Sequence, residues 1–402
     1  GKHYVLNGTK QFITNAGFAD LFVVFAKIGG EKFSALVVER GMPGVSTGQE
    51  EQKLGIRGSS TRQLILENAR VPAENLLGEA GRGHKIAFNI LNIGRFKLGS
   101  GAVGAAKDCL QVAVKYGIDR KQFGQPIVEF GSIQKKIADM ATRIYVADSM
   151  GYRTAGLLDR AIARIAPGES DRYAKEAKVI EEYTMEASIV KVYGTECLDA
   201  VADDSLQILG GYGFIKDYPI ERHYRDSRIN RIFEGTNEIN RLIIPGILMK
   251  RAAKGDLPFF DFIAKVNSEI EGKAPLPEKP SGPLGDERRL VERGKRLVAH
   301  AADIMVKKNL GDLKTKQQHL ELLADMVIDV YAMDSTVART MKLVRLRGEN
   351  QVRPQIDMCH IFVSSAADRL RGHAFRLIDN ELEGAELADA AAAITKIAPL
   401  YP

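Results

Sequence analysis

Residues 207–238 read QILGGYGFIKDYPIERHYRDSRINRIFEGTNE, and this stretch decides how the rest of the chain is interpreted. In its last segment, Ile232–Glu238, one carboxylate lies between apolar residues and a glycine, immediately before an expected helix. The apolar flanks disfavour the charged form of Glu234 and raise its pKa, while Gly235 lets a ligand approach the backbone closely. Both features suit a general base, although an ordinary helix cap at Gly235 or Thr236 is the favoured explanation when the segment is taken alone.

The composition is that of an ordinary globular protein. Of the 402 residues, 45% are hydrophobic and 27% are charged, which excludes a disordered or fibrous chain and is enough for two or three domains. No apolar run approaches the roughly 18 residues that span a membrane, so any membrane contact is expected to be peripheral. The formal net charge of +6 is modest, and the basic residues are interspersed with acids, which argues against nucleic acid as a partner.

Cys109, Cys197 and Cys359 form no CxxC pair, and the histidines lack metal-ligand spacing, so neither a disulfide framework nor a metal site is expected. A reducing compartment fits: the cytoplasm of a bacterium or the mitochondrial matrix of a eukaryote. Adjacent residues rarely face one another in a helix, so a packed cysteine is favoured over a Cys359-His360 nucleophile pair. Because the chain starts at Gly1, its sequence gives no information on targeting.

The first 69 residues alternate as β-strands do. Tyr4–Leu6 and Phe12–Thr14 are predicted strands, joined by a two-residue hairpin turn at Asn7-Gly8. Three more strands are predicted at residues 21–26, 33–38 and 63–66. A small, mainly antiparallel sheet or barrel is therefore expected over residues 1–78.

After Gly83 the period of the apolar residues changes from two to about 3.6. Four long helices are predicted, over residues 83–118, 132–165, 171–209 and 236–249. The expected fold is α+β and multidomain: the β domain is followed by a four-helix bundle with the candidate base, a Pro- and Gly-rich linker and a further helical domain. The bounds of these last three parts are 79–255, 256–285 and 286–402.

Gly99–Gly104 matches the dinucleotide-binding pattern GxGxxG. That pattern binds a dinucleotide only at a strand-to-helix turn, whereas here it follows a helical segment. Small residues that let a second helix pack closely explain it better.

The spacing of Gln207, Gly210-Gly211, Arg225-Asp226 and Glu234 resembles that of the acyl-CoA dehydrogenases. In that family a Q-x-x-G-G-x-G run leads through an R-D pair to the segment that carries the base.

Three further motifs occur in the family's order. Arg95 and Arg120–Gly124 lie where the family has an active-site arginine and an RxxFG turn, and Asn7–Asn15 matches N-G-x-K-x-W-I-T-N. The resemblance therefore covers residues 1 to about 250. Phe233 and the helical pattern beyond residue 286 resemble features of the family's very-long-chain branch.

The resemblance implies FAD-dependent α,β-dehydrogenation of acyl-CoA thioesters of long chain to trans-2-enoyl-CoA, in fatty acid β-oxidation. Glu234 would remove the α proton while a hydride passes to flavin N5, and Arg95 would orient the carboxylate. The Glu234 N–H, with a flavin ribityl hydroxyl, would hold the thioester oxygen. Some members carry the base on the residue before the arginine, but Gly94 occupies that position here. Asn92, Arg95 and Gly235 are the expected substrate residues.

The resemblance also implies a FAD site. Thr14 would bond the flavin near N5, and Phe12 would pack on its ring in place of the family's tryptophan. Arg120 would offer a planar fork to the pyrophosphate. The expected cofactor residues are Phe12, Ile13, Thr14, Arg120, Gln122, Phe123, Gln207, Gly210, Gly211, Thr236, Asn237 and Glu238.

In the family, part of each FAD site comes from a neighbouring subunit, so a homodimer is expected, with electron-transfer flavoprotein as the acceptor. The family's N-terminal helical domain would precede residue 1, so the chain is expected to be a fragment. Two alternatives stay open: a non-catalytic scaffold on the same fold, and an oxidase that uses oxygen. An amphipathic face of the C-terminal helices could contact a membrane, although solvated helices are commoner.

Overall fold

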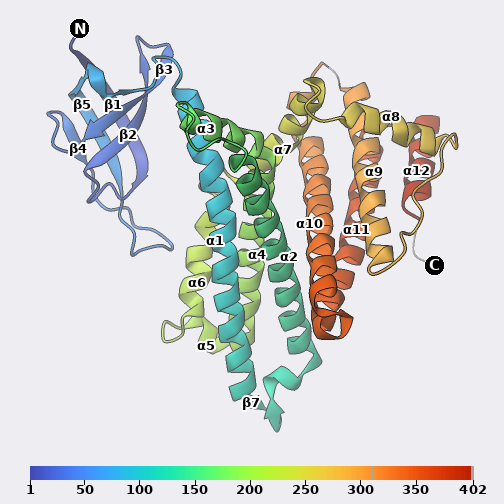
Figure 1. Ribbon diagram of the computed structural model, residues 1–402. Coiled ribbons are helices and arrows are strands. Elements are labelled where there is room, and N and C mark those ends of the chain that lie inside the picture. The colour runs from blue at the N-terminus through green and yellow to red at the C-terminus, as the bar shows by residue number, and fades with distance from the viewer. Residues whose placement is uncertain (310, 400–402) are drawn as a thin grey trace. The chain divides into compact units, whose positions relative to one another are not determined.

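The computed structural model describes residues 1–309 and 311–399. It contains two compact units, Gly1–Ile93 and Gly94–Pro402. The first is built mainly of strands and the second of helices (Figure 1). The expected α+β class is confirmed.

The first unit holds two small antiparallel sheets. In one, β5 (Thr61–Pro72) lies between β1 (His3–Thr14) and β4 (Val45–Thr47). In the other, β3 (Lys32–Glu39) lies between β2 (Leu21–Ile28) and β6 (Leu76–Leu77), which follows the 3-10 turn η1 (Ala73–Asn75). The four longer strands contribute buried residues to one core, which includes Leu6, Phe22, Val24, Leu36, Val38, Leu64, Leu66 and Val71.

The predicted hairpin at Asn7-Gly8 is wrong. β1 runs unbroken through these residues, and its register against β5 shifts between Leu6 and Gly8. The Asn7 side chain bonds across the pair, because its Oδ1 accepts from the backbone N–H of Asn68 at 2.8 Å. The turn-like dipeptide therefore forms a β-bulge, which keeps the strand in the ladder.

Long helices form the second unit. α1 (Gly83–Asp119) begins in the first unit and continues into the second, where α2 (Gly131–Ile162), α4 (Thr184–Leu209) and α7 (Asn237–Ala253) follow. The predicted helix over residues 171–209 is interrupted at Tyr183, which separates α3 (Arg172–Glu182) from α4. Short elements link the long helices: β7 (Lys121–Gln122), β8 (Gln125–Pro126), η2 (Ile127–Glu129), α5 (Gly211–Phe214), α6 (Ile220–Ser227) and η3 (Arg228–Arg231).

Gly99 lets α1 and α4 approach closely. A Cβ at Gly99 would lie 2.4 Å from the Val190 carbonyl oxygen, and one at Gly194 would lie 2.5 Å from the Gly99 carbonyl oxygen. Gly101 and Gly104 face open space. The GxGxxG run lies wholly within α1, so the packing interpretation holds for its first glycine.

The predicted linker is wrong in part, because α8 (Phe259–Ile270) forms within it. Phe259, Ile263 and Val266 are buried, at the spacing of one helix face. The prolines and glycines on either side of this helix hid that pattern. Residues 273–280 have no regular structure.

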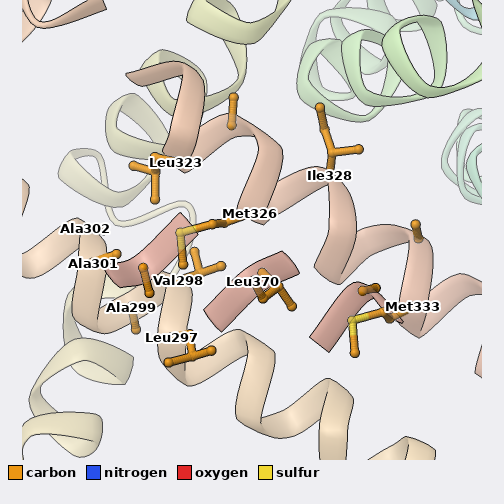
Figure 2. Close-up of a cluster of buried hydrophobic side chains, with 14 of the residues drawn as sticks. Leu297, Val298, Ala299, Ala301, Ala302, Leu323, Met326, Ile328, Met333 and Leu370 are labelled. Carbon is orange, nitrogen blue, oxygen red and sulfur yellow. The ribbon is translucent and has the colours of Figure 1, made fainter. Parts of the chain in front are cut away.

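The remaining helices are α9 (Gly285–Lys308), α10 (Gln317–Arg347), α11 (Arg353–Glu381) and α12 (Gly384–Ile397), with the short η4 (Leu313–Thr315) and η5 (Glu349–Val352) between them. We call residues 259–397 the extension. Leu297, Met326 and Leu370 lie in its apolar core (Figure 2), which continues into buried residues of α2, α4 and α7. α10 also packs directly on α2 and α7. Among the described residues, no helix has the length and apolar character of a membrane span.

Candidate active site

Glu234 lies in the turn between η3 and α7, which we call the base turn (residues 234–236). Its backbone is left-handed, with φ of 57°, and so is that of Gly235, with φ of 80°. A Cβ at Gly235 would lie 3.2 Å from Asn240 Nδ2, so glycine is required there for both space and conformation. A non-glycine residue in this region is strained and persists only where the surroundings hold it.

The buried Arg95 of α1 supports this turn, because its Nε donates to the Glu234 carbonyl oxygen at 3.3 Å. Burial raises the pKa of the Glu234 carboxyl, and the charges of Arg95 and Lys191 act against that rise. Ile232 and Phe233 are exposed, so the bundle desolvates the carboxylate and its apolar sequence neighbours do not. Asn92, one turn before Arg95, is buried.

Gly94 provides the space that the carboxylate occupies. A Cβ at this position would lie 2.4 Å from Glu234 Oε2. Within the described residues that oxygen is buried and has no hydrogen-bond partner. A side chain on residue 94 would therefore overlap the Glu234 carboxylate in its present position. The unpartnered oxygen is free to accept a proton.

Lys191 of α4 holds the base turn from within the bundle, and it was not among the predicted site residues. Its Nζ donates to the Gly235 carbonyl oxygen at 2.8 Å and to Asn237 Oδ1 at 2.7 Å. Asn240 donates to the same Gly235 carbonyl oxygen at 2.9 Å. The signal that could have revealed Lys191 is its position as a lone charge in the apolar run of residues 187–193.

The predicted cofactor residue Asn237 begins α7. Its side chain is buried and makes bonds inside the bundle, accepting from Lys191 and donating to Glu196 Oε1 at 3.0 Å. This side chain therefore supports the base turn. Thr236 caps α7, since its hydroxyl accepts from the Ile239 N–H at 3.3 Å, and Glu238 is exposed in the first turn.

A second group of predicted residues meets in one pocket of about 470 Å³ at the end of α4. Arg120, Gln122, Gly210 and Gly211 line it, together with Tyr116 and Tyr212. The Arg120 guanidinium lies 5.7 Å from the centre of the Tyr212 ring. A guanidinium that lines the same pocket as two glycines with open backbone suits a pyrophosphate group, so these residues fit the cofactor that the sequence predicts.

Two predicted cofactor residues between positions 120 and 211 do not line this pocket. Gln207 is exposed on the last turn of α4 and does not line it. Phe123, at the tip of the β7–β8 turn, has φ of 53° and a side chain that is 94% exposed.

In the first unit, Phe12, Ile13 and Thr14 end β1. The register of β1 against β5 shifts between Lys10 and Ile13, and Phe12 has φ of 56°. This irregularity turns the Phe12 ring outward, where it is 67% exposed. Thr14 is exposed too, whereas Ile13 packs partly against the core. An outward aromatic ring beside a free-standing hydroxyl fits a planar ligand.

The Cys359-His360 pair is not a nucleophile. Burial raises the pKa of the Cys359 thiol to about 12, and His360 Nδ1 lies 2.7 Å from Glu287 Oε1. No group of His, Cys, Asp and Glu in the described part of the chain is arranged to hold a metal ion.

Comparison with known proteins matches this architecture. The acyl-CoA dehydrogenase middle-domain model matches residues 1–69, and two models described as the acyl-CoA dehydrogenase C-terminal domain match residues 81–248 and 293–396. A probable acyl-CoA dehydrogenase of Bacillus subtilis (strain 168) is 46% identical over the whole chain, which spans 68% of that protein. The chain belongs to the acyl-CoA dehydrogenase family.

Other acyl-CoA dehydrogenases extend the comparison. The crystal structure of an acyl-CoA dehydrogenase from Bacillus anthracis complexed with FAD superposes on all of this chain with a TM-score of 0.97 at 45% identity, and the chain covers 68% of that structure. The very long-chain specific acyl-CoA dehydrogenase of Bos taurus is 35% identical over 92% of the chain, which spans 58% of the bovine protein. FAD is the cofactor of this family.

Proposed function

We propose that this chain provides the catalytic base and much of the FAD site of an enzyme that oxidises long-chain acyl-CoA thioesters to trans-2-enoyl-CoA in fatty acid β-oxidation. The observation that carries the proposal is the Glu234 carboxylate. Its Oε2 is buried and unpartnered beside the space at Gly94, and its backbone is held by Arg95.

Glu234 acts as the general base. Its carboxylate takes the α proton of the thioester onto Oε2 and leaves the electron pair of the C–H bond on the substrate. A raised pKa favours this step because it makes the carboxylate a stronger base, and the charge of Arg95 acts against the rise. The Glu234 N–H is the proposed donor to the thioester oxygen, where negative charge develops.

Bound FAD supplies the acceptor for the β hydride. Arg120 would hold its pyrophosphate, and Gly210 and Gly211, which line the same pocket as Arg120 and Gln122, would lie along its adenosine end. Phe12 and Thr14, exposed at the end of β1, would contact the flavin ring.

The proposal also includes specificity for long acyl chains, electron-transfer flavoprotein as the electron acceptor, and a homodimer. The similarity to the bovine very long-chain enzyme supports long-chain specificity, because it extends over 92% of the chain. Light scattering of the purified protein tests the dimer. A peripheral membrane contact through the extension is a separate proposal, which sedimentation with anionic vesicles tests.

The test is anaerobic addition of palmitoyl-CoA to the FAD-loaded full-length protein while flavin absorbance is followed. Bleaching is expected in the wild type, and Glu234→Gln should slow it by about 10²- to 10⁴-fold, as loss of a general base does. If the wild type binds FAD but does not bleach, the non-catalytic scaffold is the correct alternative. If the reduced flavin is reoxidised rapidly by oxygen but not by electron-transfer flavoprotein, the oxidase is correct.

A further inference from the structure

Lys191 is among the largest fully buried side chains, with an exposed fraction of 0%. Within the described residues its ammonium group donates to two uncharged oxygens, that of the Gly235 carbonyl and that of the Asn237 side-chain amide. Burying an ammonium group without a directly bonded carboxylate is costly, and an apolar side chain of similar length would fit the same helix run. The cost indicates that the charge has a role at this position.

The base turn is held by buried cations and amides through three consecutive carbonyls. Arg95 bonds that of Glu234, Lys191 and Asn240 bond that of Gly235, and Asn240 also bonds that of Thr236 at 3.0 Å. Lys191 and Asn240 are both fully buried, and each is carried by a long helix. The left-handed backbone of Glu234 is strained and needs such surroundings to persist.

We propose that Lys191 is a positioning residue for the base: its ammonium group holds the strained turn through the Gly235 carbonyl, and its positive charge favours the ionised Glu234 carboxylate. The inference rests on the proposed function, because Glu234 must be the base for its position to matter. Lys191 has no proposed contact with substrate or cofactor.

Four charged groups act on Lys191 from the surrounding elements: Arg95 on α1, Glu196 on α4, Glu234 in the base turn and Glu238 on α7. Burial, followed by the charge of Arg95, lowers the pKa of Lys191 from 10.5 to about 8. Lys191 therefore loses its charge at mildly alkaline pH. Any rate that depends on the charged lysine should fall there.

The test separates proton removal from oxidation. An acyl-CoA with sulfur at the β position has no β hydride to give, so its α hydrogens can only exchange. The exchange rate in D₂O is followed by mass spectrometry from pH 5 to 10 for the FAD-loaded full-length wild type, Lys191→Met, Lys191→Arg and Glu234→Gln. Replacing the buried Glu269–Arg296 pair of the extension by Glu269→Leu/Arg296→Met is the matched control, because it removes another buried cation and leaves an apolar pair.

Lys191→Met should slow exchange by roughly tenfold or more, as misplacement of a catalytic group does. The acid limb of its pH–rate profile should move to higher pH because the Glu234 carboxylate loses a nearby cation. The fall in the exchange rate near pH 8 should disappear. Lys191→Arg should recover part of the rate, and the control should retain the wild-type profile. A Lys191→Met profile equal to that of the wild type would overturn the inference.

The outcome for Glu234→Gln keeps the two ideas distinct. If it exchanges as fast as the wild type, the assignment of the base fails and the proposed function fails with it. If it does not exchange and Lys191→Met behaves as the wild type does, only the inference about Lys191 fails. Should Lys191→Met not fold, the profile of Lys191→Arg decides, because an arginine has no alkaline limb in this range.

Discussion

Lys191 near the base and Arg296 in the extension are both buried cations, with exposed fractions of 0% and 4%, yet their pKa values shift in opposite directions. Burial lowers the pKa of each, but in Arg296 the hydrogen bonds and charge of Glu269 outweigh it and raise the pKa. Arg296 Nε and Nη2 lie 2.6 Å and 3.0 Å from the two Glu269 oxygens. Lys191 bonds a carbonyl and an amide instead.

The difference shows what each region is built for. The extension neutralises its buried charge with a two-point ion pair within an apolar core, which serves stability. The active-site region leaves its lysine bonded only to neutral oxygens and its carboxylate oxygen unpartnered, so both groups titrate closer to neutral pH. Such perturbed groups are common at functional sites.

The largest effect on stability is expected from Arg296→Met alone. It leaves Glu269, with an exposed fraction of 1%, as an uncompensated buried charge. Breaking a buried pair in this way costs about 3–5 kcal/mol in the free energy of unfolding, measured by urea denaturation at pH 7. The Glu269→Leu/Arg296→Met double variant should recover most of that loss. If Arg296→Met alone were as stable as the wild type, the ion pair of the extension would not serve stability, and the distinction between the extension and the active-site region would be lost.

A smaller effect is expected in the pH dependence of stability. The pKa of Lys191 is 10.5 in the unfolded chain and about 8 in the folded chain, so between these pH values Lys191 is protonated only in the unfolded chain. The free energy of unfolding therefore rises with pH in this window. The full contribution is about 3 kcal/mol, from the size of the pKa difference. The buried charge therefore destabilises the fold most below pH 8.

Urea denaturation of the wild type and Lys191→Met at intervals from pH 7 to 11 measures this contribution. The difference between the two curves should change by that amount across the window, because the groups they share cancel. Parallel curves would show that the lysine titrates near its usual value.

The sequence predicted the helices and strands of this fold better than the contacts between residues that are far apart in the chain. Strand alternation and helix periodicity located the long strands and the helices up to residue 249, because both patterns are local, and they predicted residues 286–402 as helical without the bounds of single helices. They failed at Asn7-Gly8 and in α8, where a cross-strand bond and a buried helix face overrule turn-like composition. Local patterns also give no access to a pair such as Arg95 and Glu234, which are 139 residues apart. Only the family resemblance brought those two together.

Lys191 and Gly94 were harder still. A single lysine in an apolar helix run is as compatible with a solvent-facing stem as with full burial, since long cationic side chains often reach solvent from apolar surfaces. The importance of a glycine such as Gly94 depends on which atom would contact an added Cβ, and that atom belongs to another helix or turn. The burial of Lys191 and the contact at Gly94 are therefore properties of the packed structure.

The smallest of these effects contrasts two glycines, Gly94 beside the base and Gly294 in the extension. A Cβ at Gly94 would lie 2.4 Å from Glu234 Oε2, whereas one at Gly294 would lie 3.0 Å from a terminal methyl group of Leu370 and 3.2 Å from one of Val330. Gly94→Ala must displace the carboxylate, and a displacement of about 1 Å can slow the reaction by roughly 10²-fold. Gly294→Ala asks only for small shifts of flexible side chains and should leave the rate unchanged. Stopped-flow bleaching by palmitoyl-CoA, with circular dichroism to establish folding, measures both variants; equal rates would mean that the space at Gly94 does not set the position of the base.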